Sequence, residues 1–454
     1  MNSNTETAMT WSCSIRRLST NLLILVLCFA LVGCIGRRST NFLAPAPNLY
    51  TFETGSTYPD AAVPSQLRDT TTEIFYLTDR NPEPEATTGA TAYGDDRSNS
   101  MAFGASVVEY GDMQTWPELV ELTQSQRNQN ATRIEIKQIN EFVRFPDTPL
   151  PFLQGGGRLQ ATEVAQSDYA RSTNEMRGEI SRRLRSYGLN RVLVYVHGFN
   201  NEFSDSVNTL ANIWHYSGRL SLPITFSWPA GNDGPLAYFR DIESGEFSVF
   251  HAKEFLRILA SVPEVDRIDI VAHSRGSVVM TTALRELLIE ARAAGKNPRK
   301  AMKTGILVLA APDLDFGVAR QRLVAERFVD AFDQINVYTN PNDGALRISR
   351  IIGNATRLGG IDPEMLTMAN LEDVRERKRV NIIHVEGGGA QLGHAYFREN
   401  PAVMSDIVLT LRTRARPGLP FRPLETVREG FYTLHQSYPA EPLPEVLDRP
   451  DVDR

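Results

Sequence analysis

Residues Ile268-Asp-Ile-Val-Ala-His-Ser-Arg-Gly276 form the stretch that decides the fold. A short apolar run ends in a turn at Ser274, and apolar residues at helical spacing follow over 278–291. This order of strand, sharp turn and helix is the context of a nucleophile elbow. The elbow requires small residues two positions before and two after the serine, and Ala272 and Gly276 meet that requirement. A serine that only caps the helix is the alternative.

The alternation of apolar runs and amphipathic segments continues on both sides of this turn. Further helices are predicted at 176–187, 207–214, 248–261 and 401–414. Further strands are predicted at 192–196, 224–228, 305–311, 335–339 and 380–385. Short, uninterrupted apolar strands separated by helices predict an α/β fold, with a mostly parallel central sheet and helices on both of its faces.

The regions that flank this alternating part differ from it in composition. Strands rich in β-branched and aromatic residues are expected at 74–77, 101–108 and 134–145. We therefore assign a β-rich lead-in to 69–150, packed on the main domain. At the other end, the chain from Pro417 onward holds seven of the 26 prolines. This predicts an extended tail over 416–454 that wraps the surface or stays loose.

The first 34 residues have the pattern of a targeting segment. Two arginines precede an unbroken apolar run over 22–32, which is too short to span a bilayer but has the length of a signal-peptide core. The run ends in Leu31-Val-Gly-Cys34, which resembles the bacterial lipobox, whose cysteine is lipidated. We predict a signal peptide over 1–33 and a lipid on Cys34. An ordinary signal peptide or signal anchor that contains a cysteine is the alternative.

A lipid at this position would hold the protein on a membrane without crossing it. Ile35, rather than an aspartate, follows the cysteine, which is the usual pattern of outer-membrane lipoproteins. We expect a lipid-anchored protein of the bacterial cell envelope, on the outer membrane and facing the periplasm. The segment over 34–68 contains four prolines among Thr, Ser, Asn and Gly, and we predict that it forms a tether.

Charge and cysteine content exclude several classes of protein. Lys and Arg number 48 against 54 Asp and Glu, a formal net charge of −6, and no basic stripe supplies the phosphate contacts of a nucleic-acid-binding protein. The three cysteines are Cys13, Cys28 and Cys34, so the rest of the chain has no disulfide scaffold, thiolate metal site or cysteine nucleophile. No His and Glu pair has the spacing of a zinc protease, and we expect no metal and no cofactor.

The predicted strand at 192–196 ends in His197-Gly-Phe-Asn200. Acyl transfer through a serine needs two backbone N–H groups that face the developing oxyanion. We expect these N–H groups from Phe199, after the glycine, and from Arg275, directly after the nucleophile. The alternative is a tight turn that uses the glycine only for its conformational freedom.

A catalytic serine also requires an acid and then a histidine further along the chain. Asp343 follows a late strand and is the favoured acid, while Asp313 and Asp315, after the preceding strand, compete for the role. His394 lies in a glycine-rich loop that could bring a general base to the end of the sheet, and it is our candidate base. His384 belongs to a predicted strand, and we expect a packed strand histidine.

Six motifs occur in an order that resembles a bacterial family of alpha/beta hydrolases of undefined function, some of them lipoproteins. They are Val196-His-Gly-Phe-Asn200, Phe226-Ser-Trp-Pro229, Ala272-His-Ser-Arg-Gly276, Ala310-Ala-Pro-Asp313, Asn342-Asp343-x-Ala345-Leu346 and Gly393-His-Ala-Tyr-Phe397. The resemblance covers about 70–415, including Tyr76-Leu-Thr-Asp-Arg80 in the lead-in. It implies the alpha/beta-hydrolase fold, with Ser274 as nucleophile, Asp343 as acid and His394 as base, but no substrate. The motif order argues for one large domain over 69–415, although the length would allow several.

Together these observations predict a membrane-anchored serine hydrolase that cleaves carboxylic esters through an acyl-enzyme intermediate. Lipase, thioesterase and acyltransferase activities are close variants. The expected partners are a small-molecule or lipid ester and the membrane, with no nucleic acid, and the oligomeric state stays open. A catalytically silent hydrolase-fold lipoprotein, acting as an envelope scaffold or binding protein, is the alternative from another class.

Overall fold

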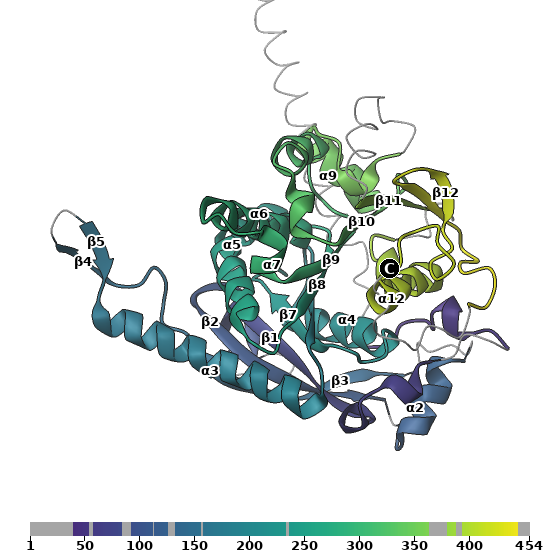
Figure 1. Cartoon of the computed structure of the whole chain (residues 1–454), viewed down its shortest axis with the longest axis horizontal. Coiled ribbons are helices and arrows are strands. Elements are labelled where there is room, and N and C mark those ends of the chain that lie inside the picture. Colours follow the sequence, from purple (N-terminus) through teal and green to yellow (C-terminus); the bar gives the residue numbers. More distant parts are fainter. Residues whose placement is uncertain are drawn as a thin grey trace, which may run out of the picture.

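One large sheet organises the molecule, and helices lie along it (Figure 1). The computed structural model describes residues 40–53, 58–83, 92–111, 113–125, 132–155, 158–232, 236–362, 379–386 and 393–443. The predicted signal peptide over 1–33 and the predicted lipidation site Cys34 lie outside the described residues.

Eleven strands of the described residues form this sheet in the order β12-β13-β11-β10-β9-β8-β6-β7-β1-β2-β3. Their bounds are β1 Thr71–Pro82, β2 Tyr93–Tyr110, β3 Ile134–Arg144, β6 Arg191–Val196, β7 Leu222–Ser227, β8 Arg267–His273, β9 Thr304–Ala310, β10 Gln334–Thr339, β11 Val380–Val385, β12 Glu425–Arg428 and β13 Phe431–Leu434. Neighbours from β13 to β1 run parallel, and antiparallel pairs lie at the two edges of the sheet. The predicted mostly parallel α/β fold is confirmed.

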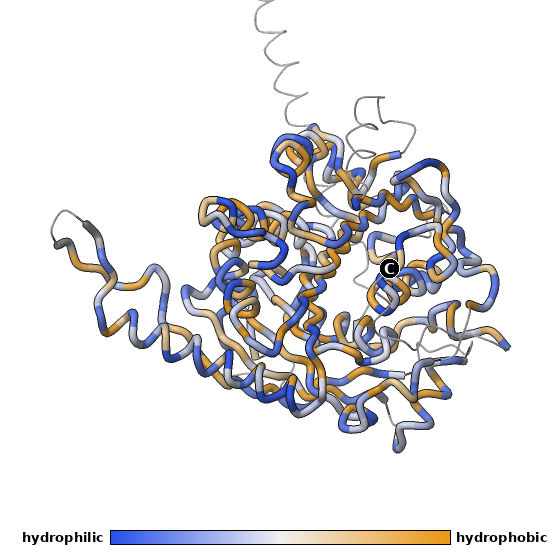
Figure 2. Tube along the Cα trace, viewed as in Figure 1, coloured by the Kyte–Doolittle hydropathy of each residue, from blue (hydrophilic) through white to orange (hydrophobic). Residues whose placement is uncertain are grey.

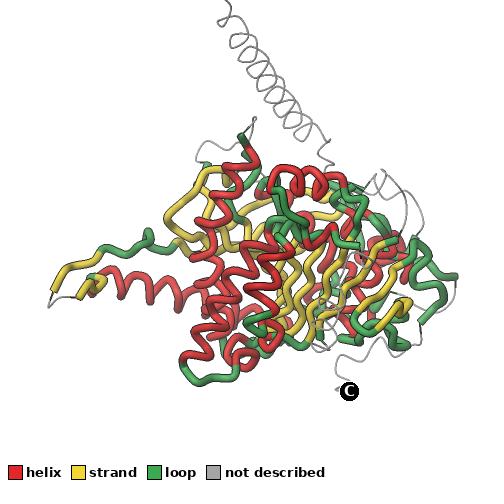
Figure 3. Tube along the Cα trace, turned by 90° about the horizontal axis from the view of Figure 1, so that it is seen from above, coloured by secondary structure: helices red, strands yellow, loops and turns green. Residues whose placement is uncertain are grey.

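Helices cover both faces of the sheet, as the view in Figure 3 shows. The helices are α2 Trp116–Thr123, α3 Glu163–Tyr187, α4 Phe203–Tyr216, α5 Ala237–Ser261, α6 Gly276–Ala293, α7 Pro298–Met302, α8 Phe316–Ala319, α9 Gly344–Gly353, α11 Tyr396–Glu399 and α12 Pro401–Thr413. Apolar residues of α3, α5 and α6 join the core on one face, and those of α4 and α12 join the core on the other. The central strands β8, β9 and β10 are thus buried on both sides, which explains their uninterrupted apolar runs.

Strand β6 shows how one sequence run supplies both cores. Val192, Val194 and Val196 belong to the core under α5 and α6, whereas Leu193 and Tyr195 belong to the core under α4. Successive side chains of a strand point to opposite faces, so an entirely apolar run fits a strand that is covered twice. The carboxyl ends of β6, β8, β9 and β10 meet at the same edge, where ligands of parallel α/β sheets usually bind.

The β-rich lead-in is an integral part of this sheet. Strand β1 runs parallel to β7, with Phe75 opposite Ile224, and β2 and β3 continue the sheet in antiparallel order. Phe75 and Phe103 are buried in the same core as the central strands. The lead-in therefore extends the main domain, and its described buried residues share the two cores of the main sheet.

The described part of the predicted tether is packed against the body, which corrects that prediction. Leu43, Leu49 and Tyr50 are buried, and the hydroxyl of Tyr50 donates to the carbonyl oxygen of Tyr216 at 2.7 Å. The backbone N–H of Ala44 donates to a side-chain oxygen of α4 at 2.7 Å. A segment with these contacts is held on the surface of α4, so 40–53 and 58–68 belong to the domain. The prolines in this segment fit an extended chain that packs on the domain as well as they fit a tether.

The described part of the proline-rich tail is also built into the domain rather than loose. Strand β13 runs parallel to β11, and β12 closes this edge of the sheet. The Arg422 guanidinium is fully buried and pairs with the buried Asp406 of α12 at 2.7 Å. The domain therefore continues past 416. Strands of four residues carry too little periodicity to be predicted from sequence.

The first half of α3 and the hairpin of β4 (Phe152–Gly155) and β5 (Arg158–Ala161) project away from the body (Figure 1). Figure 2 shows a largely hydrophilic projecting helix, whereas the apolar stretches gather in the body. The sequence analysis placed this helix at 176–187, because its fully buried apolar side chains, Met176, Ile180 and Leu184, all lie in its second half. Of the described helices, none combines the length and hydropathy needed to cross a membrane.

Candidate active site

Ser274 occupies a strained turn between β8 and α6. Its φ angle is +51°, in the left-handed region that residues other than Gly seldom adopt. Its backbone N–H donates to the carbonyl oxygen of Ala310 at 3.0 Å, which ties the turn to β9. A Cβ atom on Gly276 would collide with the His197 carbonyl oxygen and lie 2.9 Å from that of Val196. The elbow therefore needs the glycine that follows the serine by two positions.

Three side chains from distant segments meet at this turn. His394 Nε2 lies 2.6 Å from Ser274 Oγ, and His394 Nδ1 lies 2.7 Å from Asp343 Oδ2. Asp343 is fully buried, and its Oδ1 accepts the backbone N–H of Leu346 at 3.0 Å, so the carboxylate also caps α9. The structure thus brings the candidate nucleophile, base and acid into one hydrogen-bonded chain.

The two competing acids are bound elsewhere. Asp313 is buried, and its carboxylate accepts the hydroxyls of Ser349 at 2.5 Å and Tyr238 at 3.1 Å. Asp315 accepts the backbone N–H of Val318 at 2.8 Å and so caps α8. Neither carboxylate makes a hydrogen bond to the His394 ring in the described structure. His384, the other downstream histidine, lies within β11 opposite Thr339.

The surroundings of His394 favour its charged form. Burial alone opposes a charge on the imidazole, but the Asp343 carboxylate, with its charge and its hydrogen bond, outweighs burial. The nearby negative charge of Asp313 acts in the same direction. The pKa of His394 is therefore raised above its ordinary value. This arrangement suits a base that must hold a proton during the reaction.

The sequence analysis did not assign a role to His273, the residue before the nucleophile. Its Nε2 lies 3.2 Å from the backbone carbonyl oxygen of His394, and its ring stacks on Phe397 with centroids 4.4 Å apart. Burial, followed by the charge of His394, holds the pKa of His273 well below its ordinary value. A neutral His273 with its proton on Nε2 donates to that carbonyl oxygen and fixes the loop that carries His394.

The two amides expected to bind the oxyanion lie beside the elbow. A Cβ atom on Gly198 would stand 2.7 Å from the Cβ of Ser274, so the loop after β6 is in close contact with the nucleophile. Among the described residues, the backbone N–H groups of Phe199 and Arg275 donate to no other protein group. Both are available to a ligand at the carboxyl edge of the sheet.

A buried arginine from the lead-in holds this loop. Arg80 is fully buried, and its guanidinium donates to the carbonyl oxygens of Asn201 at 2.7 Å and Ala230 at 2.8 Å. It also donates to the Ser227 hydroxyl at 3.0 Å. The motif Tyr76-Leu-Thr-Asp-Arg80 was the sequence signal for this residue. Without a structure, however, nothing linked that motif to the loop after β6.

Two further titratable side chains, His197 and Asp241, lie next to this loop. Burial and the charge of Arg80 lower the pKa of His197 to about 3, and its ring stacks on Trp228 with centroids 5.1 Å apart. The buried carboxylate of Asp241 accepts the backbone N–H of Asn200 at 3.0 Å, where φ is +53°. Burial raises the pKa of Asp241, although its hydrogen bonds oppose the shift. Asp241 therefore helps to set the path of the loop that carries Phe199.

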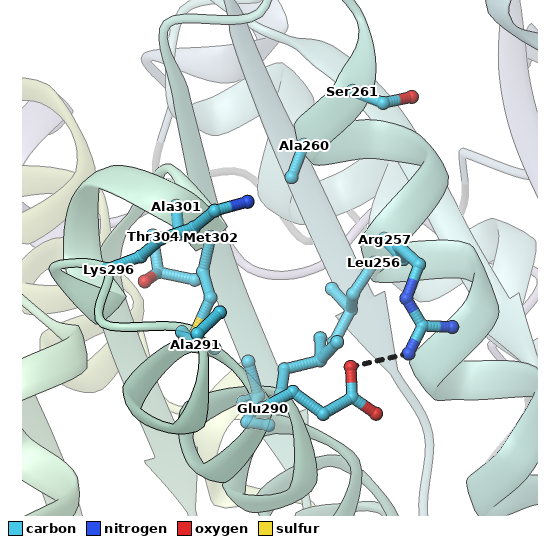
Figure 4. A pocket seen from close by; sticks show the side chains of 13 residues that line it. Leu256, Arg257, Ala260, Ser261, Glu290, Ala291, Lys296, Ala301, Met302 and Thr304 are labelled. Atoms are coloured by element: carbon cyan, nitrogen blue, oxygen red, sulfur yellow. Dashed lines mark hydrogen bonds and ion pairs between the residues drawn. The ribbon is translucent and has the colours of Figure 1, made fainter.

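A separate cavity of about 420 Å³ lies between α5, α6 and α7 (Figure 4). Leu256 and Met302 are among the side chains that line it, and Arg257 pairs with Glu290 at 2.6 Å across its wall. Ser274 precedes the opposite end of α6, so this cavity is distinct from the triad. The described residues contain no group of three or more His, Cys, Asp or Glu side chains placed to hold a metal ion.

A comparison with known protein families agrees with the fold. A family model described as an alpha/beta hydrolase of unknown function (DUF900) matches residues 172–413, more than half of the chain. A solved structure, "Pyrobaculum calidifontis esterase monoclinic form", is 13% identical over 50% of this chain and 77% of that chain, with a TM-score of 0.27. A similarity at this level supports no conclusion about activity. No curated protein matches the sequence. The chain belongs to the family of alpha/beta hydrolases of unknown function that the model describes.

Proposed function

We propose that this protein is a serine hydrolase that cleaves carboxylic esters. The observation that carries the proposal is the continuous chain of hydrogen bonds from Asp343 through His394 to Ser274, with contacts of 2.7 and 2.6 Å. A serine whose hydroxyl is bound to an imidazole, which is bound in turn to a buried carboxylate, has the arrangement of an activated nucleophile. The strained φ angle of Ser274 supports the same role.

In the first half of the reaction, Ser274 Oγ attacks the carbonyl carbon of the ester and its proton passes to His394 Nε2. The carbonyl oxygen becomes an oxyanion, which accepts hydrogen bonds from the N–H groups of Phe199 and Arg275. When the tetrahedral intermediate collapses, the bond to the alcohol oxygen breaks and His394 donates its proton to that oxygen. The alcohol leaves, and the acyl group stays on Ser274.

In the second half, a water molecule attacks the acyl carbonyl carbon and gives a proton to His394. Collapse of this second intermediate breaks the bond to Ser274 Oγ, which recovers the proton, and releases the acid. Asp343 holds the imidazole in the tautomer with the proton on Nδ1 and stabilises the imidazolium in both halves. No metal or cofactor takes part in this scheme.

We also propose that Cys34 carries a lipid and that the mature protein lies on the periplasmic face of the outer membrane. This part of the proposal is supported by the sequence pattern Leu31-Val-Gly-Cys34 after an apolar run. Metabolic labelling with an alkyne-bearing fatty acid tests it: the wild type should be labelled and Cys34→Ala should not. Equal labelling of both proteins would contradict the lipidation site.

A fluorophosphonate probe tests the nucleophile directly. The wild type should be labelled, and Ser274→Ala should lose the labelling. Ser248→Ala is a matched control, because Ser248 is fully buried on α5 and its hydroxyl has no hydrogen-bond partner among the described residues. Labelling of Ser274→Ala at the level of this control would refute the proposal.

The length of the acyl chain can be measured on the same proteins. A series of p-nitrophenyl esters from acetate to palmitate, with Ser274→Ala as the background, would give kcat/KM for each chain length. Hydrolysis above this background for at least one ester is the expected result. A wild type that is labelled by the probe but cleaves no oxygen ester would shift the reaction toward thioesters or acyl transfer.

A further inference from the structure

Three short segments surround the elbow at the carboxyl edge of the sheet. We call residues 236–242, 316–324 and 344–353 the mouth rim. The Tyr238 hydroxyl links the first segment to the third, since it lies 2.9 Å from the Ser349 hydroxyl of α9. It also lies 3.1 Å from Asp313, three residues before the second segment begins. The Tyr238 ring also packs on Phe199 of the proposed oxyanion loop, with centroids 5.4 Å apart. The mouth rim therefore borders the proposed catalytic site.

The mouth rim exposes large apolar side chains of the kind that usually lie in a protein core. Ile351 is 76% exposed and Leu236 57%, and Phe239 and Val318 are 44% and 40% exposed. The segment before Leu236 is not described, and these values concern the described residues. Four exposed apolar side chains on three adjoining segments favour contact with an apolar phase.

The charge of the mouth rim is opposite to that of the whole chain. Its three segments contain five arginines and one acidic residue, whereas the chain has a net charge of −6. The arginines are Arg240, Arg320, Arg322, Arg347 and Arg350. The acidic residue, Asp241, is buried and accepts backbone N–H groups of the neighbouring loops. The next acids on α5, Glu243 and Glu246, lie beyond the rim. Apolar and basic side chains together are typical of segments that lie on anionic membranes.

The chain emerges from the described structure at the same edge of the sheet. The Thr40 hydroxyl donates to Asp205 in the first turn of α4 at 2.7 Å. This turn directly follows the loop that carries Phe199. Cys34 precedes Thr40 by six residues, and six residues span at most about 20 Å. A lipid on Cys34 would therefore hold this edge of the molecule close to the bilayer.

We propose that the mouth rim lies on an anionic bilayer surface and that the ester substrate is a lipid taken from that surface. This inference rests on the proposed function, because it uses both the anchor at Cys34 and the triad at Ser274. Apolar side chains such as Ile351 and Phe239 enter the boundary between headgroups and acyl chains, while the arginines contact anionic headgroups. The ester bond then reaches Ser274 without leaving the interface.

A fluorescent label on the mouth rim tests the docking. The full-length chain has no cysteine beyond Cys34, so Ile351→Cys introduces a single thiol in the body. Ile289→Cys is the matched control, because Ile289 is also an exposed isoleucine but lies near the far end of α6. The parent chain without a new cysteine gives the background of the labelling. Each protein is labelled with an environment-sensitive dye and anchored in vesicles of phosphatidylethanolamine and phosphatidylglycerol.

The label at position 351 should shift its emission to the blue and be quenched by lipids that carry a nitroxide, and the label at position 289 should show neither effect. Replacing phosphatidylglycerol with phosphatidylcholine should reduce the quenching at position 351. Equal behaviour of the two labels on anchored protein would overturn the docking. This result does not depend on catalysis, so it separates the docking from the proposed reaction.

A charge reversal tests the link to the substrate. Arg347→Glu with Arg350→Glu should lower, at least tenfold, the ratio of hydrolysis of a lipid ester in vesicles to hydrolysis of dissolved p-nitrophenyl acetate. The control pair Lys296→Glu with Lys300→Glu changes the net charge equally on exposed residues outside the rim, and this ratio should stay within twofold of wild type. If the two double variants gave the same ratio, the proposal that the substrate is a membrane lipid would be wrong. If the wild type hydrolysed neither the lipid ester nor p-nitrophenyl acetate, the proposed function itself would be refuted.

Discussion

Asp343 Oδ2 lies 2.7 Å from Nδ1 of His394, although the two residues are 51 positions apart. Asp343 ends the loop after β10 and caps α9, so its carboxylate is fixed by the backbone before it meets the imidazole. His394 reaches it from the segment after β11. The contact joins two strand ends of the parallel sheet, and it determines the protonation of the proposed base.

We expect Asp343→Asn to lower kcat/KM for an ester by about four orders of magnitude, the loss typical of this change in a serine triad. The asparagine can no longer hold the imidazole tautomer or stabilise the imidazolium. Hydrolysis of p-nitrophenyl acetate gives the rate, and Asp313→Asn is the comparison because Asp313 contacts Tyr238 and Ser349 instead. A larger loss for Asp313→Asn would make Asp313 the functional acid.

The pH profile should follow the raised pKa of His394. A base must be neutral, so kcat/KM in the wild type should fall as the pH drops through a pKa above the ordinary histidine value. Asp343→Asn removes the main cause of that shift and should move this acidic limb to lower pH. Rates measured between pH 4 and 9 test both statements. An acidic limb at the same pH in both proteins would contradict this account of His394.

The glycine after the elbow should be sensitive to a single methyl group. Gly276→Ala places a Cβ atom against the carbonyl oxygens of His197 and Val196, so the strand and the helix must move apart. We expect a loss of at least about 2 kcal/mol in the free energy of unfolding, together with a loss of activity. Gly178→Ala is the control: it lies on an exposed part of α3 with open space around the new Cβ, and it should stabilise the helix by about 0.5–1 kcal/mol. Urea denaturation measures both, and equal stability of the two variants would count against the close contact.

Arg80 should be indispensable although it lies outside the triad. Arg80→Met leaves the buried carbonyl oxygen of Ala230 and the part-buried one of Asn201 without this donor, and we expect a loss of at least about 3 kcal/mol in the free energy of unfolding. Arg80→Lys should recover little of this free energy, because one ammonium group cannot reach all the acceptors that the planar guanidinium contacts. Arg171→Met is the control, since Arg171 is exposed on α3. Urea denaturation of the three variants decides the point, and wild-type stability of Arg80→Met would refute it.

The C-terminal region should contribute to stability through one buried ion pair. Arg422→Met leaves the fully buried Asp406 without its charged partner, and such a loss costs about 3–5 kcal/mol in the free energy of unfolding. Replacing both partners, with Asp406→Leu, should recover part of this energy because no buried charge remains. Arg416→Met changes an exposed arginine nearby and should have little effect. If thermal and urea unfolding of Arg422→Met match this control, the tail does not act as part of the domain.

The strands around the elbow were predictable because they are buried on both sides. The predicted runs 192–196, 268–272 and 335–339 lie within β6, β8 and β10. The sequence also placed Ser274, Asp343 and His394 each just after such a strand. It favoured Asp343 but kept Asp313 and Asp315 as alternatives, since all three follow strands of the same sheet. Their side-chain contacts, and not their order in the chain, show which of them meets His394: Asp343 does, whereas Asp313 binds Ser349.

The two ends of the domain were predicted less well. Residues 34–68 and 416–454, of which the structure describes 40–53, 58–68 and 416–443, were assigned to a tether and to a tail, because prolines and short apolar runs give no periodic signal. In the structure they are held by isolated contacts, such as Tyr50 with Tyr216 and Arg422 with Asp406. Contacts of this kind depend on partners far away along the chain. They are invisible until the fold brings the partners together.

The sequence by itself determined the α/β class, the elbow and the three candidate catalytic residue types in their order, because these depend on local periodicity and on turn chemistry. The tertiary structure decided which carboxylate meets His394. It also showed that Arg80 holds the loop of Phe199 and that the mouth rim gathers exposed apolar and basic side chains at one edge. The physical reason is that charge pairing, desolvation and surface exposure depend on distances in space, and only the folded sheet sets those distances.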